Sequence, residues 1–123
     1  MDTFQELVAV ACRGDLRLEM LNRYCVDRQT DIPSACNTLA LHIAQEFLTG
    51  ALGFDESDQA VNSLFAVMTS KRYFECLGQV FPEAAFKVYQ AFAAGEGIHL
   101  GDKGGEMPYA KYTIPMLREI LRS

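Results

Sequence analysis

The chain has 123 residues, of which 50% are hydrophobic and 22% are charged, a composition typical of one globular domain and unlike that of a disordered segment. A chain of this length removes roughly two-thirds of its unfolded surface from water, so it can fold without disulfides or a metal. The formal charge is −5 at pH 7. We therefore expect no nucleic-acid partner, since phosphate binding needs a basic surplus, and the charge favours a cationic protein partner.

The first ten residues contain no basic region followed by an apolar core, so the sequence predicts no secretory signal. Charged residues interrupt every apolar run before it reaches the length of a membrane span. We therefore expect a cytoplasmic protein with no membrane partner. Cys12, Cys25, Cys36 and Cys76 form no C-x-x-C pair, and in a reducing compartment we expect them to be small hydrophobes without a metal or another cofactor.

Residues 4–25 have a helical pattern whose seven-residue spacing continues across Gly14. The pattern predicts one helix that bends or breaks near Gly14, or two helices of which the second is capped by Asp15. A glycine inside a helix costs up to about 1 kcal/mol relative to alanine, so its place on the apolar seam needs a packing reason. The seam also makes a homodimer through this helix an expectation.

Three further helices are predicted between residues 31 and 81. Asp31 caps the first, which has Pro33 in its first turn, Asp55 caps the second, and Ser70 caps the third. Apolar residues at helical spacing give each helix an inward face. These faces are Cys36, Leu39, Ala40, Ile43, Phe47 and Ala51; Val61, Leu64, Phe65 and Met68; and Tyr73, Leu77, Val80 and Phe81.

Two more helices complete the chain, one that begins near Pro82 and ends at Gly95, and one that Thr113 caps. The sequence thus predicts an all-α fold, a compact bundle of five or six helices in one domain over residues 1–123. A long glycine-rich excursion precedes the C-terminal helix, and two of its segments could pair as a short hairpin. The inward residues are Ala85, Val88, Tyr89 and Phe92, followed by Ile114, Leu117, Ile120 and Leu121.

Residues 93–115 contain five of the nine glycines, two of the four prolines and one of the two histidines. Loops longer than about 12 to 15 residues are uncommon in compact domains and are usually functional or disordered. The glycine spacing matches no phosphate-binding motif, so glycines that allow turns are the better interpretation. His99 beside Glu96 or Asp102 has the chemistry for acid–base catalysis, but a loop histidine bonded to nearby carbonyls explains it as well.

A metal site would have to combine residues from distant parts of the chain. His42 and Glu46 stand four residues apart, and Glu96, His99 or Asp102 would have to complete the ligand set. A surface pair between His42 and Glu46 explains these two residues equally well. We therefore expect no metal site and no catalytic residue.

Aromatic residues are concentrated in the two helices before the excursion. Phe74 and Phe86 lie outside the inward faces, so each helix would be apolar nearly all round, as in a central helix or one that a partner covers. Tyr109 and Tyr112 in the excursion are amphipathic residues of a kind enriched at interfaces.

Three segments, "FDESDQAVNSLFAVM", "FPEAAFKVYQAFAAGEGIH" and "YAKYTIPML", carry a resemblance that covers the C-terminal two-thirds of the chain. The chain resembles small, mostly uncharacterised bacterial proteins with an acidic-capped A-V-N helix, a P-E-x-x-[FW]-x-V-Y-x-A-F-x-x-G-E segment and a K-Y-T-x-P stretch. These elements are residues 60–62, 82–96 and 111–115 here. Such proteins occur on mobile gene cassettes and near interbacterial toxins, so the resemblance implies an immunity-type or accessory binding role, and it brings no catalytic motif.

Together these features favour a non-enzymatic interaction protein that binds a macromolecule, for example a basic toxin, or that self-associates as a homodimer. The alternative is a small-molecule-binding domain or minor enzyme with a pocket between the bundle and residues 95–112. The residues expected to bind a ligand or partner are Phe74, Phe86, Glu96, His99, Asp102, Lys103, Tyr109 and Tyr112.

Overall fold

The computed structural model describes residues 4–77, 82–95 and 112–122. These residues form seven helices and no strand, so the predicted all-α class is confirmed, whereas the predicted number of helices was too low. The glycine-rich excursion and its hairpin lie outside the described residues. The helices are α1 (Phe4–Cys12), α2 (Leu18–Arg28), α3 (Ile32–Leu48), α4 (Phe54–Met68), α5 (Lys71–Leu77), α6 (Glu83–Ala94) and α7 (Ile114–Arg122).

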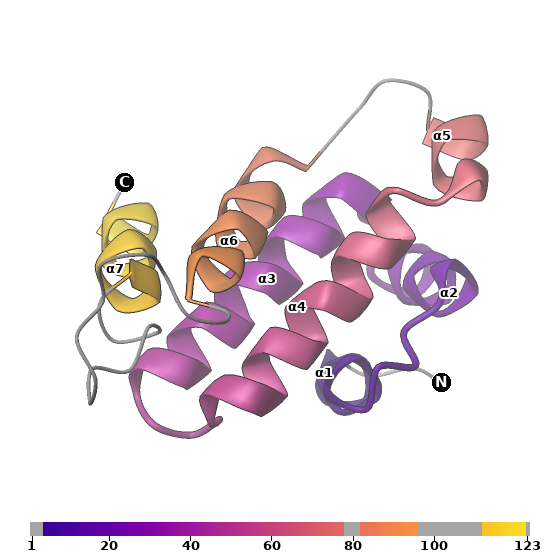
Figure 1. Ribbon diagram of the computed structural model, residues 1–123. Helices are drawn as coiled ribbons and strands as arrows, with labels where there is room; N and C mark the ends of the chain where they lie inside the picture. The colour runs from indigo at the N-terminus through magenta and orange to yellow at the C-terminus, as the bar shows by residue number, and fades with distance from the viewer. Residues whose placement is uncertain (1–3, 78–81, 96–111, 123) are drawn as a thin grey trace.

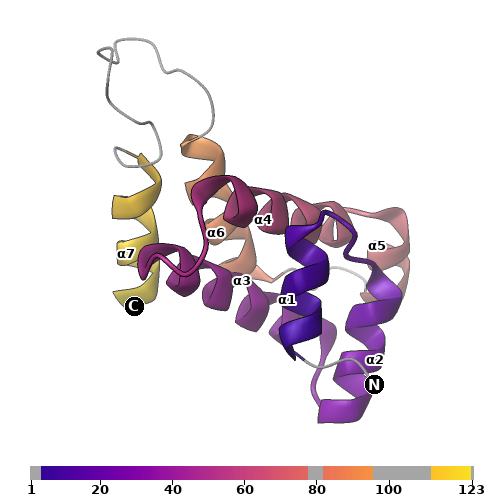
Figure 2. The same ribbon diagram turned by 90° about the horizontal axis from the view of Figure 1, so that it is seen from below.

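Helices α3 and α4 form an antiparallel pair at the centre of the molecule (Figure 1). Helix α6 packs against both of them, and α7 lies on the outer side of α6, where it also touches α3. Helices α1 and α2 cover the other side of the central pair, and α5 lies at the end farthest from α7 (Figure 2). The two ends of this elongated bundle therefore present different surfaces.

The core is built around α3, which is buried over most of its length. Cys36, Leu39, Ala40 and Ile43 are fully buried, as their predicted inward face requires. A helix that contacts neighbours on several sides is apolar around most of its circumference, and α3 packs against α1, α2, α4, α6 and α7. Small residues such as Ala40 allow these helices to come close.

The predicted N-terminal helix is broken into α1 and α2. Gly14 has a φ of +78°, a left-handed conformation that ends a helix and that residues with a Cβ rarely adopt. Arg17, rather than Asp15, occupies the N-cap position of α2, so the predicted cap is wrong. The amide of Leu16 donates to Oγ of Ser63 on α4 at 3.1 Å and fixes the connection to the core.

Four residues of the seven-residue seam are buried inside the chain itself, whereas Phe4 and Leu18 are half-buried and Gly14 is exposed. Leu7 and Ala11 on α1 and Leu21 and Cys25 on α2 are at most 4% exposed. Helix α1 packs on α4 and α3, helix α2 packs on α3, and the break at Gly14 lets the chain change direction between them. These four residues are therefore not accessible to a second copy of the chain.

Two of the predicted caps are formed. The amide of Ser34 donates to Oδ1 of Asp31 at 2.7 Å, and the amide of Tyr73 donates to Oγ of Ser70 at 3.2 Å. Gly53, and not Asp55, is the N-cap of α4. Asp55 is the second residue of the helix, where the helix dipole still favours its negative charge. None of the helices within the described ranges has both the length and the apolar character needed to cross a bilayer.

Candidate functional site

The candidate site lies along the contact between α6 and α7. The two helices run antiparallel (Figure 1), and the hydroxyl of Thr113 donates to the carbonyl of Ala91 at 2.7 Å. Thr113 is fully buried, so this bond ties the start of α7 to the last turns of α6. Helix α7 buries only Leu117 completely, and Met116 remains 39% exposed.

A groove of about 520 Å³ opens where α3, α6 and α7 meet, within the size range of ligand pockets, roughly 300 to 1,000 Å³. Its floor is apolar and its rim carries charged and amide side chains. The lining covers about two turns of α6, from Glu83 to Gln90, but little more than one turn of α7, from Met116 to Ile120. The groove is therefore roughly 10 Å long on the α6 side and roughly 6 Å long on the α7 side. The lining residues are Leu41 from α3, Glu83, Ala84, Lys87 and Gln90 from α6, and Met116, Glu119 and Ile120 from α7.

The position of the α6 wall depends on a hydrogen bond from outside the helix. Pro82 occupies the N-cap position and makes no side-chain bond to the first turn. Instead, the amide of Ala85 donates to Oδ1 of Asn37 on α3 at 2.9 Å. Asn37 lies one helical turn before Leu41, so the same stretch of α3 forms the floor and holds the wall.

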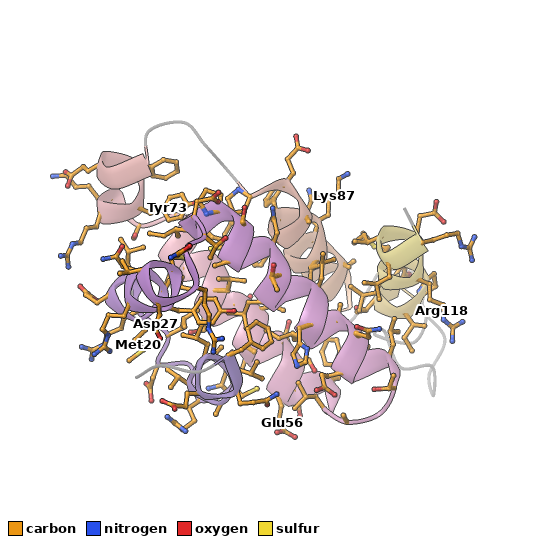
Figure 3. All side chains as sticks on the ribbon, turned by 180° about the vertical axis from the view of Figure 1, so that it is seen from behind. Met20, Asp27, Glu56, Tyr73, Lys87 and Arg118 are labelled. Atoms are coloured by element: carbon orange, nitrogen blue, oxygen red, sulfur yellow. The ribbon has the colours of Figure 1, made fainter. Side chains whose placement is uncertain are left out.

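The rim of the groove is charged and faces solvent. Glu83, Lys87 and Glu119 are all exposed, and a guanidinium nitrogen of Arg122 lies 3.9 Å from a carboxylate oxygen of Glu119. Glu83 lies in the first turn of α6, where the helix dipole stabilises a carboxylate. Figure 3 shows Lys87 extending into solvent from α6 and Arg118 extending from the side of α7 that is turned away from α6.

A second hollow, of about 300 Å³, lies between the α1–α2 connection, α4 and α5. An ion pair between Arg72 and Glu19, both of which line this hollow, joins α5 to α2. This hollow is smaller and more open. We therefore consider the α3–α6–α7 groove the better candidate site.

The predicted contact residues are not brought together where the structure describes them. Phe74 is 47% exposed on α5, at the opposite end of the molecule from the half-buried Tyr112, which directly precedes α7 (Figures 1 and 2). Phe86 lies on α6 between these ends. The five remaining predicted contacts, Glu96, His99, Asp102, Lys103 and Tyr109, lie outside the described residues.

Phe86 belongs to a stack of aromatic rings on the α4–α6 seam. The ring of Phe65 lies face to face with that of Tyr89, with a centroid distance of 3.7 Å and an interplanar angle of 7°. Phe86 is stacked beside both rings, at 6.0 Å from Phe65 and 6.4 Å from Tyr89. Partners within the chain therefore account for the apolar character of Phe86 outside the inward face.

The other polar candidates have structural surroundings. Nε2 of His42 lies 3.1 Å from Oε1 of Glu46, an ion pair when the histidine is protonated, although the two groups are not aligned as a hydrogen bond. The ring of Phe4 contacts the His42 imidazole edge-on at 4.9 Å. Across the described ranges, no group of three or more His, Cys, Asp or Glu side chains is placed to hold a metal ion.

The described thiols are free and poorly reactive. Burial raises the pKa of Cys36 to about 12, and it raises the pKa of Cys25 as well. Burial, with a further contribution from Glu56, also raises the pKa of the half-buried Cys12. Because the thiolate is the nucleophile, none of these three residues is activated at neutral pH.

Sequence reasoning missed the groove because no single segment contains it. Leu41 and Met116 are apolar residues outside the inward faces that helical spacing predicts. Phe74 and Phe86 are predicted to be contact residues because they have this same property. Apolar residues outside the inward faces thus indicate where apolar surface stays uncovered, but only the packing of α7 on α6 shows which of these residues lie together. Comparisons of the chain with protein-family models, curated proteins and solved structures give no match.

Proposed function

We propose that the protein is a non-enzymatic interaction domain that binds a cationic macromolecular partner in the groove between α3, α6 and α7. The observation that carries this proposal is the open apolar floor between two antiparallel helices, with Met116 left 39% exposed. Exposed apolar surface bounded by polar residues is characteristic of interaction sites. The overall charge of −5 would speed the approach of a basic partner.

Several features of the groove support binding rather than catalysis. Its ionisable groups, Glu83, Lys87 and Glu119, are exposed on the rim. Acid–base catalysis requires a group that neighbouring groups or burial have tuned and positioned. The bonds from Ala85 to Asn37 and from Thr113 to Ala91 instead fix the walls, as a preformed docking surface requires.

The partner class follows from the charge and from the resemblance noted above. The resemblance implies an immunity-type or accessory binding role, so a basic toxin domain is one candidate partner. Self-association is the other candidate in the same functional class. The two are separated by sedimentation of the purified protein with and without the partner.

The proposal can be tested with a photoreactive amino acid in place of Met116 in cells of the organism that encodes the protein. We expect light to couple this position to a specific protein. The matched control carries the same photoreactive group at Val26, which is 73% exposed on α2 and far from the groove. The purified partner should then bind wild-type protein, and Met116→Asp should weaken that binding about tenfold or more.

Two results would refute the proposal. Equal coupling from positions 116 and 26 would mean that the groove is not the docking surface. A purified partner that binds wild type and Met116→Asp equally well would lead to the same conclusion. Val26→Asp provides the control for a general effect of an added charge.

Small-molecule binding in the same groove is a second candidate, because a volume of about 520 Å³ accommodates a compact ligand. The pocket expected between the bundle and residues 95–112 falls largely on residues outside the described ranges. A fragment screen by nuclear magnetic resonance tests this candidate. Fragments that shift the amide signals of Ala84 and Ile120 with micromolar affinity would support it, and a screen without such shifts would exclude it.

A further inference from the structure

The α6 wall of the groove is held near both of its ends by hydrogen bonds to other helices. Its lining residues lie within residues 83–90. At one end, the amide of Ala85 donates to Asn37 on α3. At the other end, the carbonyl of Ala91 accepts from Thr113, at the start of α7. Positions 85 and 91 are about 9 Å apart along the helix, so the wall lies between two fixed points.

Asn37 takes the place of a cap that α6 lacks. Pro82 occupies the N-cap position and makes no side-chain bond to the first turn. An N-cap side chain accepts from the second or third amide of a helix. Ala85 is the third residue of α6, and Asn37 supplies its acceptor from another helix. The first turn of α6 is thereby aligned on α3, whose Leu41 forms the floor of the groove.

Thr113 has the corresponding role at the end of α6. The last carbonyls of a helix have no donor within the helix, and the amide of Gly95 donates to Phe92 and not to Ala91. The buried hydroxyl of Thr113 donates to the Ala91 carbonyl at 2.7 Å. This bond sets where α7 begins relative to α6, and with it the position of Met116 on the opposite wall.

Hydrogen bonds fix such positions more closely than apolar packing does. Apolar contact is non-directional, whereas a hydrogen bond requires its donor, hydrogen and acceptor to lie nearly in line. Neither Asn37 nor Thr113 is among the residues that line the groove. A substitution at either residue can therefore change the groove without removing a contact with the partner.

We infer that Asn37 and Thr113 are positioning residues, which set the spacing of the groove walls and, through it, the affinity for the partner. This inference rests on the proposed function and adds two residues outside the groove to those that determine binding. A preformed surface binds without the cost of ordering its walls, and the loss of either bond restores that cost. Substitutions that do not touch a ligand can change its affinity by about twofold to thirtyfold.

Thr113 allows the cleaner substitution, because valine has nearly the same shape and lacks the hydroxyl. Thr113→Val should weaken binding of the partner that couples to position 116 by about fivefold. Thr113→Ser keeps the donor and should bind within about twofold of wild type. Isothermal titration calorimetry measures the affinities, and urea unfolding shows that each variant is folded under the conditions of the titration.

At the other end of the wall, Asn37→Ala should also weaken binding by about fivefold, and Asn37→Asp, which keeps an acceptor, should restore it. A carboxylate can itself attract a cationic partner, so this rescue needs a control for charge. In Asn37→Ala/Thr38→Asp the same charge stands on the exposed neighbouring residue and supplies no acceptor to Ala85. This double variant should stay as weak as Asn37→Ala.

The amide signals of Lys87 and Ile120 in nuclear magnetic resonance spectra report on the two walls without the partner. Both residues line the groove, and neither takes part in the two bonds. Their signals should shift in Thr113→Val and Asn37→Ala and return in Thr113→Ser and Asn37→Asp. Wild-type affinity in either of the first two variants, weak binding by Thr113→Ser, or weakened binding with unshifted wall signals would each overturn the inference.

The inference and the proposed function can fail separately. If a partner couples to position 116 and binds all of these variants as tightly as wild type, the inference is wrong and the proposed function stands. If nothing couples specifically to position 116, both are wrong.

Discussion

The bond between Ala85 and Asn37 gives the sharpest prediction for stability. Asn37→Ala removes the oxygen that accepts from the Ala85 amide at 2.9 Å, across a separation of 48 residues. Pro82, at the N-cap position, makes no side-chain bond that could replace it. The amide of Ala85 is then left without an acceptor at a part-buried position, and the start of α6 loses its side-chain cap.

The expected loss follows from two measures of the same bond. Removal of an N-cap side chain costs about 0.5 to 2 kcal/mol, and leaving a buried amide without a partner costs about 1 to 3 kcal/mol. Ala85 is 1% exposed and Asn37 is half-buried, so we expect a decrease of about 1.5 kcal/mol in the free energy of unfolding, which lies within both ranges. For a chain of this size, this corresponds to a decrease in Tm of about 5 to 8 °C.

Urea unfolding followed by circular dichroism measures the stability, and amide hydrogen exchange locates the change. Exchange of the Ala85 amide should accelerate, while that of Ile43 in the core should follow global stability alone. Asn37→Asp keeps an acceptor near the positive end of the α6 dipole and should retain most of the stability. Thr38→Ala changes the exposed neighbouring side chain on α3 and should have little effect.

The reasoning is refuted if Asn37→Ala and Thr38→Ala have the same stability and the Ala85 amide is equally protected in both. The bond would then contribute nothing in solution, and the α6 wall would be held by apolar packing alone.

Three further predictions concern local features of the chain. Gly14→Ala should lower the free energy of unfolding by about 1 to 2 kcal/mol in urea unfolding, because φ at this residue is +78°. The new Cβ would lie 2.8 Å from Nε2 of Gln59, yet adding Gln59→Ala should restore little stability. Full recovery would show that crowding by Gln59, and not the backbone angle, causes the loss. In a chain with Cys36 as its only cysteine, iodoacetamide should label this thiol at neutral pH only as fast as the protein unfolds, since burial raises its pKa to about 12. Rapid labelling of the folded protein would contradict the burial of Cys36. The bond from the Ser34 amide lowers the pKa of Asp31, so Asp31 stabilises the fold above its unfolded pKa of about 4 and loses this effect as pH falls through the lower folded pKa. Asp31→Asn should therefore make the urea midpoint less sensitive to pH between about 5 and 2. An unchanged pH profile would count against the cap.

Local features of the fold could be predicted from the sequence because they depend on neighbouring residues. The cap by Asp31 and the inward face of α3 each follow from spacings of three or four positions. The structure contains the cap and buries the first four residues of that face, whereas Ala51 is exposed after the end of α3. The errors at Asp15 and Asp55 concern helix ends, where several nearby polar residues can begin the same helix. Continuity of the apolar spacing across Gly14 gave no information about the backbone angle at that residue.

The groove could not be predicted in the same way. Leu41, Ala84 and Met116 are far apart in the sequence, and their meeting depends on how α6 and α7 lie on α3. The hydrogen bond from Ala85 to Asn37 has the same character, since an asparagine within a helix gives no sign of which amide it will bind. Sequence patterns indicate which faces are apolar, whereas three-dimensional packing decides which apolar residues stay uncovered.

The exposed rim has a consequence for how this protein can evolve. Glu83, Lys87, Gln90 and Glu119 all face solvent, and substitutions at such positions usually change stability by less than about 0.5 kcal/mol. Their identity can drift through many generations without endangering the bundle underneath. If the groove binds a partner as proposed, descendants of one ancestral gene can acquire different binding preferences while keeping the same helices.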